Sequence, residues 1–440
     1  MKRILFTSIL TLLLNNFISA QWIEQQSGVT SQLNAVSSPA PPVFNQGWIC
    51  GNNGVVLRTT NNGNNWANVS SGIPVNIDLF SIRAVNSQMV FTSGKNPSGT
   101  SFIFRTTNSG LNWSVVHTQT NITNYGFAEI YGTYYLIASP LNSRWQIWRS
   151  TNSGVSWDSA GLYLPQSGSE TGFINSVYSL EEKIWFGTNN SRIYRSFWGG
   201  NWQALSTVPL VNSRSVVFQY LLTEAVGSGI CGDINIIKST NLGSNWLPLN
   251  TAGNGFVSGT ACHPGLIGKF WYTKNQFIYT NSASDTFALQ YTAPAGNYTH
   301  IGANYLGSAA VWAVRDNGGI SKYTGEIGIQ TISTEIPELF SLSQNYPNPF
   351  NPSTIIRFQI PLLSTTPLGR GVSGEAGRGV FTLLKVYDIL GNDITTLLNQ
   401  QLSPGTYSID WDGSNYPSGL YFYTLRSGDY TETKKMILLK

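Results

Sequence analysis

The residues whose types could cleave a substrate are sparse in the larger part of this chain. Hydrolysis of a glycosidic bond generally needs two carboxyl groups that flank the scissile bond. Glu181 and Glu182 are adjacent, and we predict that they form a turn before the strand-like run KIWF at 183–186. We therefore expect no catalytic residue among the twelve acidic residues of segment 21–326, which are Glu24, Asp78, Glu129, Asp158, Glu170, Glu181, Glu182, Glu224, Asp233, Asp285, Asp316 and Glu326.

Nucleophiles and metal ligands are equally sparse. The sequence has no GxSxG elbow for a serine nucleophile. Pro264 follows His263, which favours a turn over a Cys–His pair. With three cysteines at least one is unpaired; a Cys231–Cys262 disulfide and buried free thiols both stay open. No CxxC or clustered histidine spacing supports zinc, so we expect no metal and no cofactor. The dispersed residues are Cys50, Cys231, Cys262, His117, His263 and His300.

The composition excludes several classes of protein. Of 440 residues 41% are hydrophobic, 13% aromatic and only 10% charged, against about 25% charged in a typical soluble domain. Such a chain is neither disordered nor a helical bundle built on Glu, Lys and Leu. The formal net charge is +4 and the basic residues are scattered, so we expect no nucleic-acid partner.

The first twenty residues have the pattern of a secretory signal peptide. Lys2 and Arg3 precede an apolar stretch at 4–14, and small residues end the segment at Ser19 and Ala20. No later stretch approaches the roughly 20 apolar residues of a spanning helix. We expect an exported protein without a transmembrane segment, with residues 1–20 removed.

An internal repeat predicts the architecture. Four ungapped copies are TTNNGNNW (59–66), TTNSGLNW (106–113), STNSGVSW (150–157) and STNLGSNW (239–246), each preceded by a strand-like run that ends in a base. With degenerate copies after 195, 279 and 322, the repeat recurs every 41–47 residues. This period with short strands indicates an all-β, seven-bladed β-propeller over 21–325. Six blades is the alternative, if the unit at 279 is incomplete.

Each copy is suited to a hairpin, with Asn as a turn acceptor, Gly at positive φ and Trp between sheets. The copies resemble the Asp-box, or BNR repeat, with Asn at the acidic position, and the run GWICGNNGVVLRTTNNGNNW (47–66) resembles propellers of the photosystem II assembly-factor type. The Asp-box is a fold-stabilising turn in its families, so the resemblance implies a structural role. The motif residues are Asn61, Gly63, Trp66, Asn108, Gly110, Trp113, Asn152, Gly154, Trp157, Asn241, Gly243 and Trp246.

The last repeat lacks its Trp-led fourth strand, and the missing piece stands at the other end of the ring sequence. WIEQQSG at 22–28 is similar to WANVSSG at 66–72, the fourth strand of the first repeat. We predict that Trp22 and its neighbours form the outer strand of the seventh sheet and close the ring, which leaves only short edges exposed.

The carboxy-terminal part has a different pattern, with short alternating runs separated by Pro, Gly and Asn turns. This predicts an Ig-like antiparallel β-sandwich at 340–440 after a linker at 326–339. Segments YPNPFNP (346–352), VYDILG (386–391), PGTYSIDWDG (404–413), SGLYFYTL (418–425) and KKMILLK (434–440) resemble the type A sorting domain of the type IX secretion system. The residues that carry this resemblance are Pro347, Asn348, Pro349, Tyr387, Gly391, Trp411, Gly413, Gly419, Tyr421, Lys434 and Lys435.

The resemblance implies export across the outer membrane of a Gram-negative bacterium, with the secretion machinery as a partner and a cell-surface or extracellular location. We expect a monomeric, noncatalytic propeller that presents a binding or adhesion face to a glycan or protein ligand. Loops 95–99, 140–144 and 163–167 are candidates, because loops on a rigid scaffold carry binding residues. Asp-box propellers include sialidases, so the alternative is a secreted, sialidase-like glycoside hydrolase with a cryptic acid pair.

Overall fold

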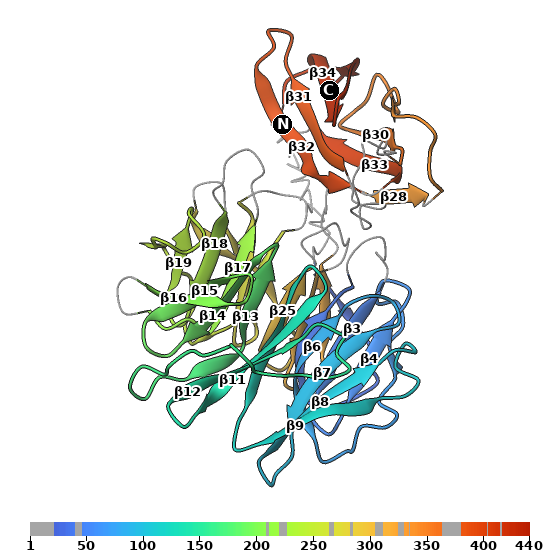
Figure 1. Cartoon of the computed structure of the whole chain (residues 1–440). Coiled ribbons are helices and arrows are strands. Elements are labelled where there is room, and N and C mark those ends of the chain that lie inside the picture. Colours follow the sequence, from blue (N-terminus) through green and yellow to red (C-terminus); the bar gives the residue numbers. More distant parts are fainter. Residues whose placement is uncertain are drawn as a thin grey trace, which may run out of the picture.

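The computed structural model contains two bodies built from β-strands (Figure 1). It describes residues 22–39, 46–207, 211–219, 227–263, 268–281, 285–303, 311–323, 330–333, 335–362, 380–402, 404–413 and 416–440. The predicted signal peptide and most of the Gly-rich insertion at 361–380 lie outside these residues. No helix among the described residues is long and apolar enough to span a bilayer.

The described residues between 22 and 323 form seven antiparallel sheets, numbered here in chain order. Sheets 1 to 3 comprise β2 (Leu33–Ser37), β3 (Gly47–Gly51), β4 (Val56–Thr59) and β5 (Ala67–Asn68); β6 (Asp78–Ala84), β7 (Val90–Lys95), β8 (Thr100–Thr106) and β9 (Ser114–Thr120); and β10 (Asn124–Ile130), β11 (Thr133–Leu141) and β12 (Arg144–Ser150). Sheets 4 and 5 comprise β13 (Gly172–Leu180), β14 (Lys183–Thr188), β15 (Arg192–Phe197) and β16 (Asn201–Ser206); and β17 (Ser215–Gln219), β18 (Ser228–Gly232), β19 (Ile236–Ser239) and β20 (Leu247–Pro248). Sheet 6 comprises β21 (Val257–Cys262), β22 (Phe270–Lys274), β23 (Phe277–Asn281) and β24 (Phe287–Thr292), and sheet 7 comprises β1 (Trp22–Gln25), β25 (Tyr298–Ala303), β26 (Val311–Arg315) and β27 (Ile320–Tyr323).

The sheets are arranged as a ring around a central axis. The first strand of each sheet contacts the first strand of the next, in the order β2, β6, β10, β13, β17, β21 and β25, and β25 returns to β2. In Figure 1, β6, β13 and β25 lie toward the middle, and β4, β12 and β16 toward the outside. This arrangement is a β-propeller.

The amino-terminal strand completes the last sheet. β1 pairs antiparallel with β27, with Trp22 opposite Tyr323 and Gln25 opposite Ile320. This is the position that the sequence analysis gave to segment 22–28. An ion pair between Glu24 and Arg315 adds to the backbone pairing. The two ends of the ring sequence are therefore joined within one sheet.

Sheet 3 departs from the predicted pattern, because the described residues give it three strands. The chain after Trp157 follows β12 only through single bridges, Arg149 to Asp158 and Arg144 to Pro165. Gly161, at a φ of 73°, and Pro165 interrupt any regular ladder there. The prediction of a Trp-led fourth strand is thus wrong for this repeat.

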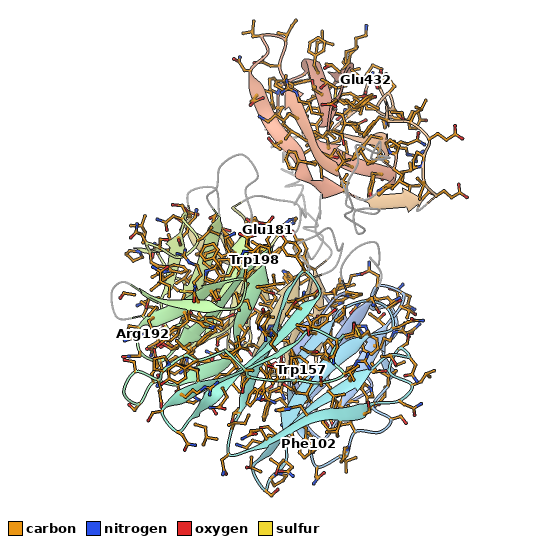
Figure 2. All side chains as sticks on the ribbon, in the orientation of Figure 1. Phe102, Trp157, Glu181, Arg192, Trp198 and Glu432 are labelled. Carbon is orange, nitrogen blue, oxygen red and sulfur yellow. The ribbon has the colours of Figure 1, made fainter. Side chains whose placement is uncertain are left out.

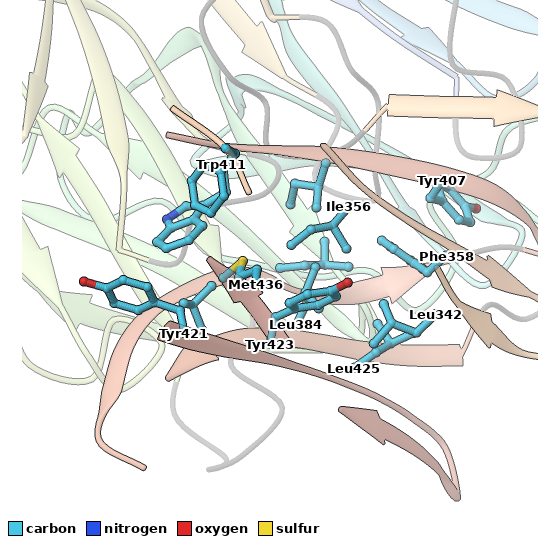
Figure 3. Packing of buried hydrophobic residues seen from close by; sticks show 14 of the residues in the cluster. Leu342, Ile356, Phe358, Leu384, Tyr407, Trp411, Tyr421, Tyr423, Leu425 and Met436 are labelled. Carbon is cyan, nitrogen blue, oxygen red and sulfur yellow. The ribbon is translucent and has the colours of Figure 1, made fainter. Parts of the chain in front are cut away.

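The second body is a sandwich of two four-stranded sheets. One has the order β28-β33-β30-β29 and the other β32-β31-β34-β35. Their bounds are β28 (Gln330–Ser333), β29 (Ser341–Leu342), β30 (Ser353–Ile360), β31 (Val380–Tyr387), β32 (Asp393–Leu402), β33 (Gly405–Asp412), β34 (Gly419–Ser427) and β35 (Tyr430–Leu438). A single apolar cluster fills the space between the sheets, including Trp411, Tyr423 and Met436 (Figure 3).

The predicted linker at 326–339 is too long. β28 lies within it and pairs with β33, where Gln330 faces Ser408. The run Thr331-Ile332-Ser333 contains β-branched residues, which suit an edge strand. The sandwich therefore begins at Gln330 and not at 340.

The three cysteines are all buried and unpaired. Burial raises the pKa of the Cys50 and Cys262 thiols to about 12, and it also raises the pKa of Cys231. The disulfide that the sequence left open between Cys231 and Cys262 is absent. All three side chains act as small apolar residues of the core.

Candidate functional site

The four repeated turns have one hydrogen-bond pattern, seen clearly in the copy at 106–113. The Thr106 hydroxyl donates to Asn108 Oδ1 at 2.9 Å and accepts the Gly110 amide at 3.0 Å. Asn108 Oδ1 also accepts the Asn112 amide at 3.0 Å. Gly110 has a φ of 85°, which favours glycine. The neutral Asn therefore supplies the acceptor that an Asp would supply. The same bonds join the matching residues of the other copies, Asn61 and Gly63, Asn152 and Gly154, and Asn241 and Gly243.

The tryptophan of each turn packs against the preceding sheet. Trp113 meets Trp48 of sheet 1 edge-on at 6.3 Å between ring centroids. Trp157 meets Phe91 of sheet 2 at 5.7 Å. The other two follow the same rule, Trp66 against Trp312 and Trp246 in one cluster with Trp185. Each tryptophan is thus part of a seam between sheets.

Trp22 packs in the same way at sheet 7, against the preceding sheet 6. It lies edge-on to Trp271 of sheet 6, with centroids 6.1 Å apart, and is 1% exposed. Gln290 Oε1 accepts the indole N–H groups of both Trp22 and Trp271, at 3.0 and 2.6 Å. Gln25 Oε1 likewise accepts those of Trp66 and Trp312, at 3.1 and 3.0 Å.

The bases that end the third strands have a role that the sequence did not reveal. Arg105 Nε donates to the Ser153 carbonyl of the next sheet at 2.8 Å, and Arg195 Nη1 donates to the Leu242 carbonyl at 2.9 Å. Both acceptor residues precede the motif glycine and have positive φ values of 58°. These bases hold the turn of the following sheet. The recurring residues of the repeated turns therefore have a structural role, in the turns themselves or in the seams between sheets.

The strand order divides the ring into two faces. The face that we call the turn face carries the repeated turns and the turns between first and second strands. The loop face carries the turns between second and third strands and the connections between sheets. Glu181 and Glu182 lie on the turn face, where the Glu182 carbonyl accepts the Trp198 amide at 2.7 Å (Figure 2).

Most acidic residues of the ring have a structural partner. Burial alone would raise the pKa of Glu24, but hydrogen bonds from Arg315 and Ser321 lower it. Among the described residues of the ring seven acids pair with a base, namely Glu24, Glu129, Asp158, Glu170, Glu182, Asp233 and Asp285. Asp78 and Asp316 accept backbone N–H groups. Glu224 and Glu326 lie outside the described residues.

Glu181 forms no ion pair within the described part of the chain. Burial raises the pKa of its carboxyl, and the neighbouring Glu182 raises it further. The two residues form a two-residue turn between β13 and β14, in which Glu181 has a φ of 53°. Glu182 is bound to Lys183. The turn was predicted, and it places no second free carboxylate beside Glu181.

No group of three His, Cys, Asp or Glu side chains in the described ranges could hold a metal ion. His263 stacks on Trp271 at 5.1 Å, and its side chain belongs to the seam between sheets 6 and 7. The His300 ring accepts the Val36 amide on Nδ1 at 3.2 Å. Burial lowers the pKa of His300 to about 4, so the ring stays neutral.

Two of the three candidate loops lie together on the loop face. The Arg144 guanidinium lies over the Tyr163 ring, 5.4 Å from its centroid, and donates to the Leu162 carbonyl at 3.0 Å. Tyr163 is 67% exposed. We call this pair the rim cluster, because β12 lies on the outside of its sheet. In the loop at 95–99, Lys95 contacts Thr123 and not the rim cluster.

A second cluster on the loop face was missed by sequence reasoning. The Arg214 guanidinium lies between two phenyl rings, 4.7 Å from Phe173 and 4.1 Å from Phe256. Its Nε donates to Asp233, and Asn212 holds the other oxygen of that carboxylate at 3.1 Å. Phe173, Arg214 and Phe256 stand at the starts of three consecutive first strands, so the cluster borders the axis. Ile234 follows Asp233 in the chain and is exposed. We call Phe173, Arg214, Phe256 and Ile234 the mouth cluster.

A hydrogen bond crosses the axis of the ring beside this cluster. Asn175, two residues after Phe173, has a φ of 63° in an irregular part of the β13–β14 pairing. Its Nδ2 donates to the Asn34 carbonyl of sheet 1 at 2.8 Å, and Asn34 Nδ2 donates to the Leu79 carbonyl at 2.7 Å. Sheets 1 and 4 are not neighbours, so this bond spans the axis.

Most signature residues of the sandwich hold its fold together. Trp411 and Tyr421 are core residues, and a Cβ on Gly413 would lie 2.9 Å from Leu438. The Pro347 carbonyl accepts the Thr354 hydroxyl at 2.8 Å, and Asn348 Oδ1 accepts the Ile437 amide at 2.9 Å. The others are peripheral: Pro349 in the same turn, Tyr387 and Gly419 at strand ends, Gly391 with a φ of 82°, Lys434 paired with Glu432, and Lys435, whose carbonyl accepts Gln344 Nε2.

Comparisons with known proteins match the ring and the sandwich separately. Among solved structures, YCF48 bound to D1 peptide aligns with a TM-score of 0.54 at 14% identity, covering 69% of this chain and 94% of that chain. YCF48 from Cyanidioschyzon merolae aligns with a TM-score of 0.50 at 15% identity, covering 69% and 98%. Both likenesses show the β-propeller fold. No curated protein matches the chain.

The sandwich has a family match of its own. Residues 344–439 match the model of the secretion system C-terminal sorting domain. This family marks proteins that the type IX secretion system carries across the outer membrane. The chain therefore carries a type IX sorting domain behind its β-propeller and is secreted by that route.

Proposed function

We propose that the ring is a noncatalytic binding module that meets its ligand through the mouth cluster of the loop face. The observation that carries this proposal is the Arg214 guanidinium held between the Phe173 and Phe256 rings beside the axis. Arginine fixed in this way loses little side-chain freedom on binding, because its orientation is set in advance.

The chemistry of the cluster indicates the kind of ligand group. Asp233 engages the Nε edge of Arg214, and the Nη atoms make no hydrogen bond within the described residues. Phe256 and Ile234 are 51% and 53% exposed. A carboxylate, sulfate or phosphate group could bind the free Nη edge while an apolar surface covers the exposed side chains. An acidic glycan or an acidic protein segment would fit.

The arrangement of the acids supports a binding module over a hydrolase. The described acids of the ring other than Glu181 are engaged by bases or by backbone amides. A two-carboxylate hydrolase needs both groups available on either side of the bond. Arg214 gives the ring a recognition group without a neighbouring acid pair.

The test uses the purified full chain on a glycan array, with fluorogenic glycosides to detect turnover. We expect saturable binding without turnover, and Arg214→Gln lowers the affinity about tenfold, as loss of one charged hydrogen-bond donor does. Arg144→Gln in the rim cluster is the matched variant and leaves the affinity unchanged. Turnover by the native chain, or a loss with Arg144→Gln alone, would contradict the proposal.

A further inference from the structure

The turn between β31 and β32 displays two apolar side chains that serve no packing role in the sandwich. Ile389 is 68% exposed and Leu390 is 83% exposed. Neither belongs to the core cluster or packs against it. Both lie in the signature VYDILG and within the family match at 344–439. Their exposure costs about 25 cal/mol per Å² of apolar surface left in water.

The turn that carries these side chains is firmly organised. Asp388 Oδ1 accepts the amides of Leu390 and Asn392 at 2.8 and 2.9 Å, and Oδ2 accepts Asn392 Nδ2 at 2.8 Å. The Gly391 amide donates to the Asp388 carbonyl at 3.1 Å. Gly391 has a φ of 82°, which completes the reversal. The two side chains are therefore held outward by a fixed backbone.

One ion pair lies beside the turn. Lys385 Nζ donates to Asp393 at 2.8 Å across the base of the two strands. The Asp388 carboxylate forms no ion pair within the described residues and accepts three hydrogen bonds from amides of the turn. The surface around Ile389 and Leu390 thus offers apolar contact beside one carboxylate, Asp388, whose hydrogen bonds are made within its own turn.

We propose that Ile389 and Leu390 form a docking knob, which the type IX secretion machinery receives in an apolar recess. A sorting domain acts by being recognised, and this signature turn keeps two exposed apolar residues that the fold does not use. The inference rests on the family match of residues 344–439 and is independent of the ligand of the ring.

The test measures export of the full chain in a bacterium that has a type IX system. We expect Ile389→Ser with Leu390→Ser to lower the amount in the medium about tenfold, as loss of central contact residues does, and to leave the chain in the periplasm. Leu390→Ala gives a smaller loss. The unfolding temperature of the purified variants stays unchanged, since both side chains are exposed.

The matched control is Ile336→Ser with Leu339→Ser. These side chains are 59% and 76% exposed but lie outside the family match, and we expect normal export. Deletion of residues 344–439 distinguishes the sorting assignment of the domain from the docking role of Ile389 and Leu390. Export of the deleted chain would overturn the sorting assignment itself, whereas blocked export of the deleted chain with normal export of the double serine variant would overturn the knob.

Discussion

The ring and the sandwich bury their aromatic residues in different ways. The ring spreads them over seams, so that Trp113, Trp157 and Trp22 each contact an aromatic residue of the preceding sheet. The sandwich gathers Trp411 and its partners in one cluster. In the ring the recurring Ser or Thr, Asn, Gly and Trp of each repeat take part in a turn or a seam, whereas one sandwich motif leaves Ile389 and Leu390 exposed. A signature residue without a structural task is therefore the better pointer to function.

The same contrast predicts where each body is vulnerable. A single core loses contacts at one place when a large side chain is removed. The ring instead depends on every seam, and the seam at sheet 7 is completed by a short strand from the far end of the sequence. Damage at this seam frees the β27 edge, and an unpaired edge invites association with other chains.

The largest expected effect is that of Trp22→Ala. Trp22 is fully buried against Trp271 and Tyr323, and truncation of such a side chain costs about 3–5 kcal/mol of unfolding free energy. Calorimetry should show a lower transition for the ring and an unchanged one for the sandwich. Trp411→Ala is the corresponding truncation in the sandwich and should lower the sandwich transition alone. A ring that keeps its melting temperature and stays monodisperse without residues 22–28 would refute the closure.

A smaller effect is expected from pH at the seam between sheets 7 and 1. The pKa of His300 is about 4 in the folded ring, against 6.5 when unfolded, because burial disfavours the charged ring. The unfolded chain then binds more protons between these values, so the contribution to stability is complete above pH 6.5 and is lost as the pH falls toward 4. The loss is at most about 1.4 kcal/mol per pH unit.

Chemical denaturation across this pH range measures the effect. His300→Asn is the matched variant, because its Oδ1 can accept the Val36 amide but does not titrate. We expect the native ring to lose stability more steeply than the variant between pH 6.5 and 4. Equal slopes for the two rings would show that His300 does not carry the dependence.

The features that could be predicted from the sequence are those whose signals lie within one short segment. The turn at 106–113 contains its donors, acceptors and positive-φ glycine within eight residues, so its pattern could be interpreted without the fold. Arg105 stood out at a strand end, but its partner Ser153 lies in the next sheet. The mouth cluster joins residues 173, 214 and 256, which are 41 and 42 residues apart and so follow the period of the repeat, but the position is occupied by Phe, Arg and Phe and belongs to no recurring motif. The closure was accessible because Trp22 begins a segment similar to 66–72.

The smallest effect should come from the acceptor of a single turn. In Asn108→Ala the Thr106 hydroxyl and the Asn112 amide both lose their acceptor, and we expect a loss of about 1 kcal/mol in the unfolding free energy of the ring. Asn108→Asp keeps the oxygen and restores the acidic residue of the Asp-box pattern, so its stability should stay within about 0.5 kcal/mol of the native ring. Urea denaturation resolves these values. If the alanine and aspartate variants lost the same stability, the turn would depend on the amide nitrogen, and the equivalence of Asn and Asp as acceptors would fail.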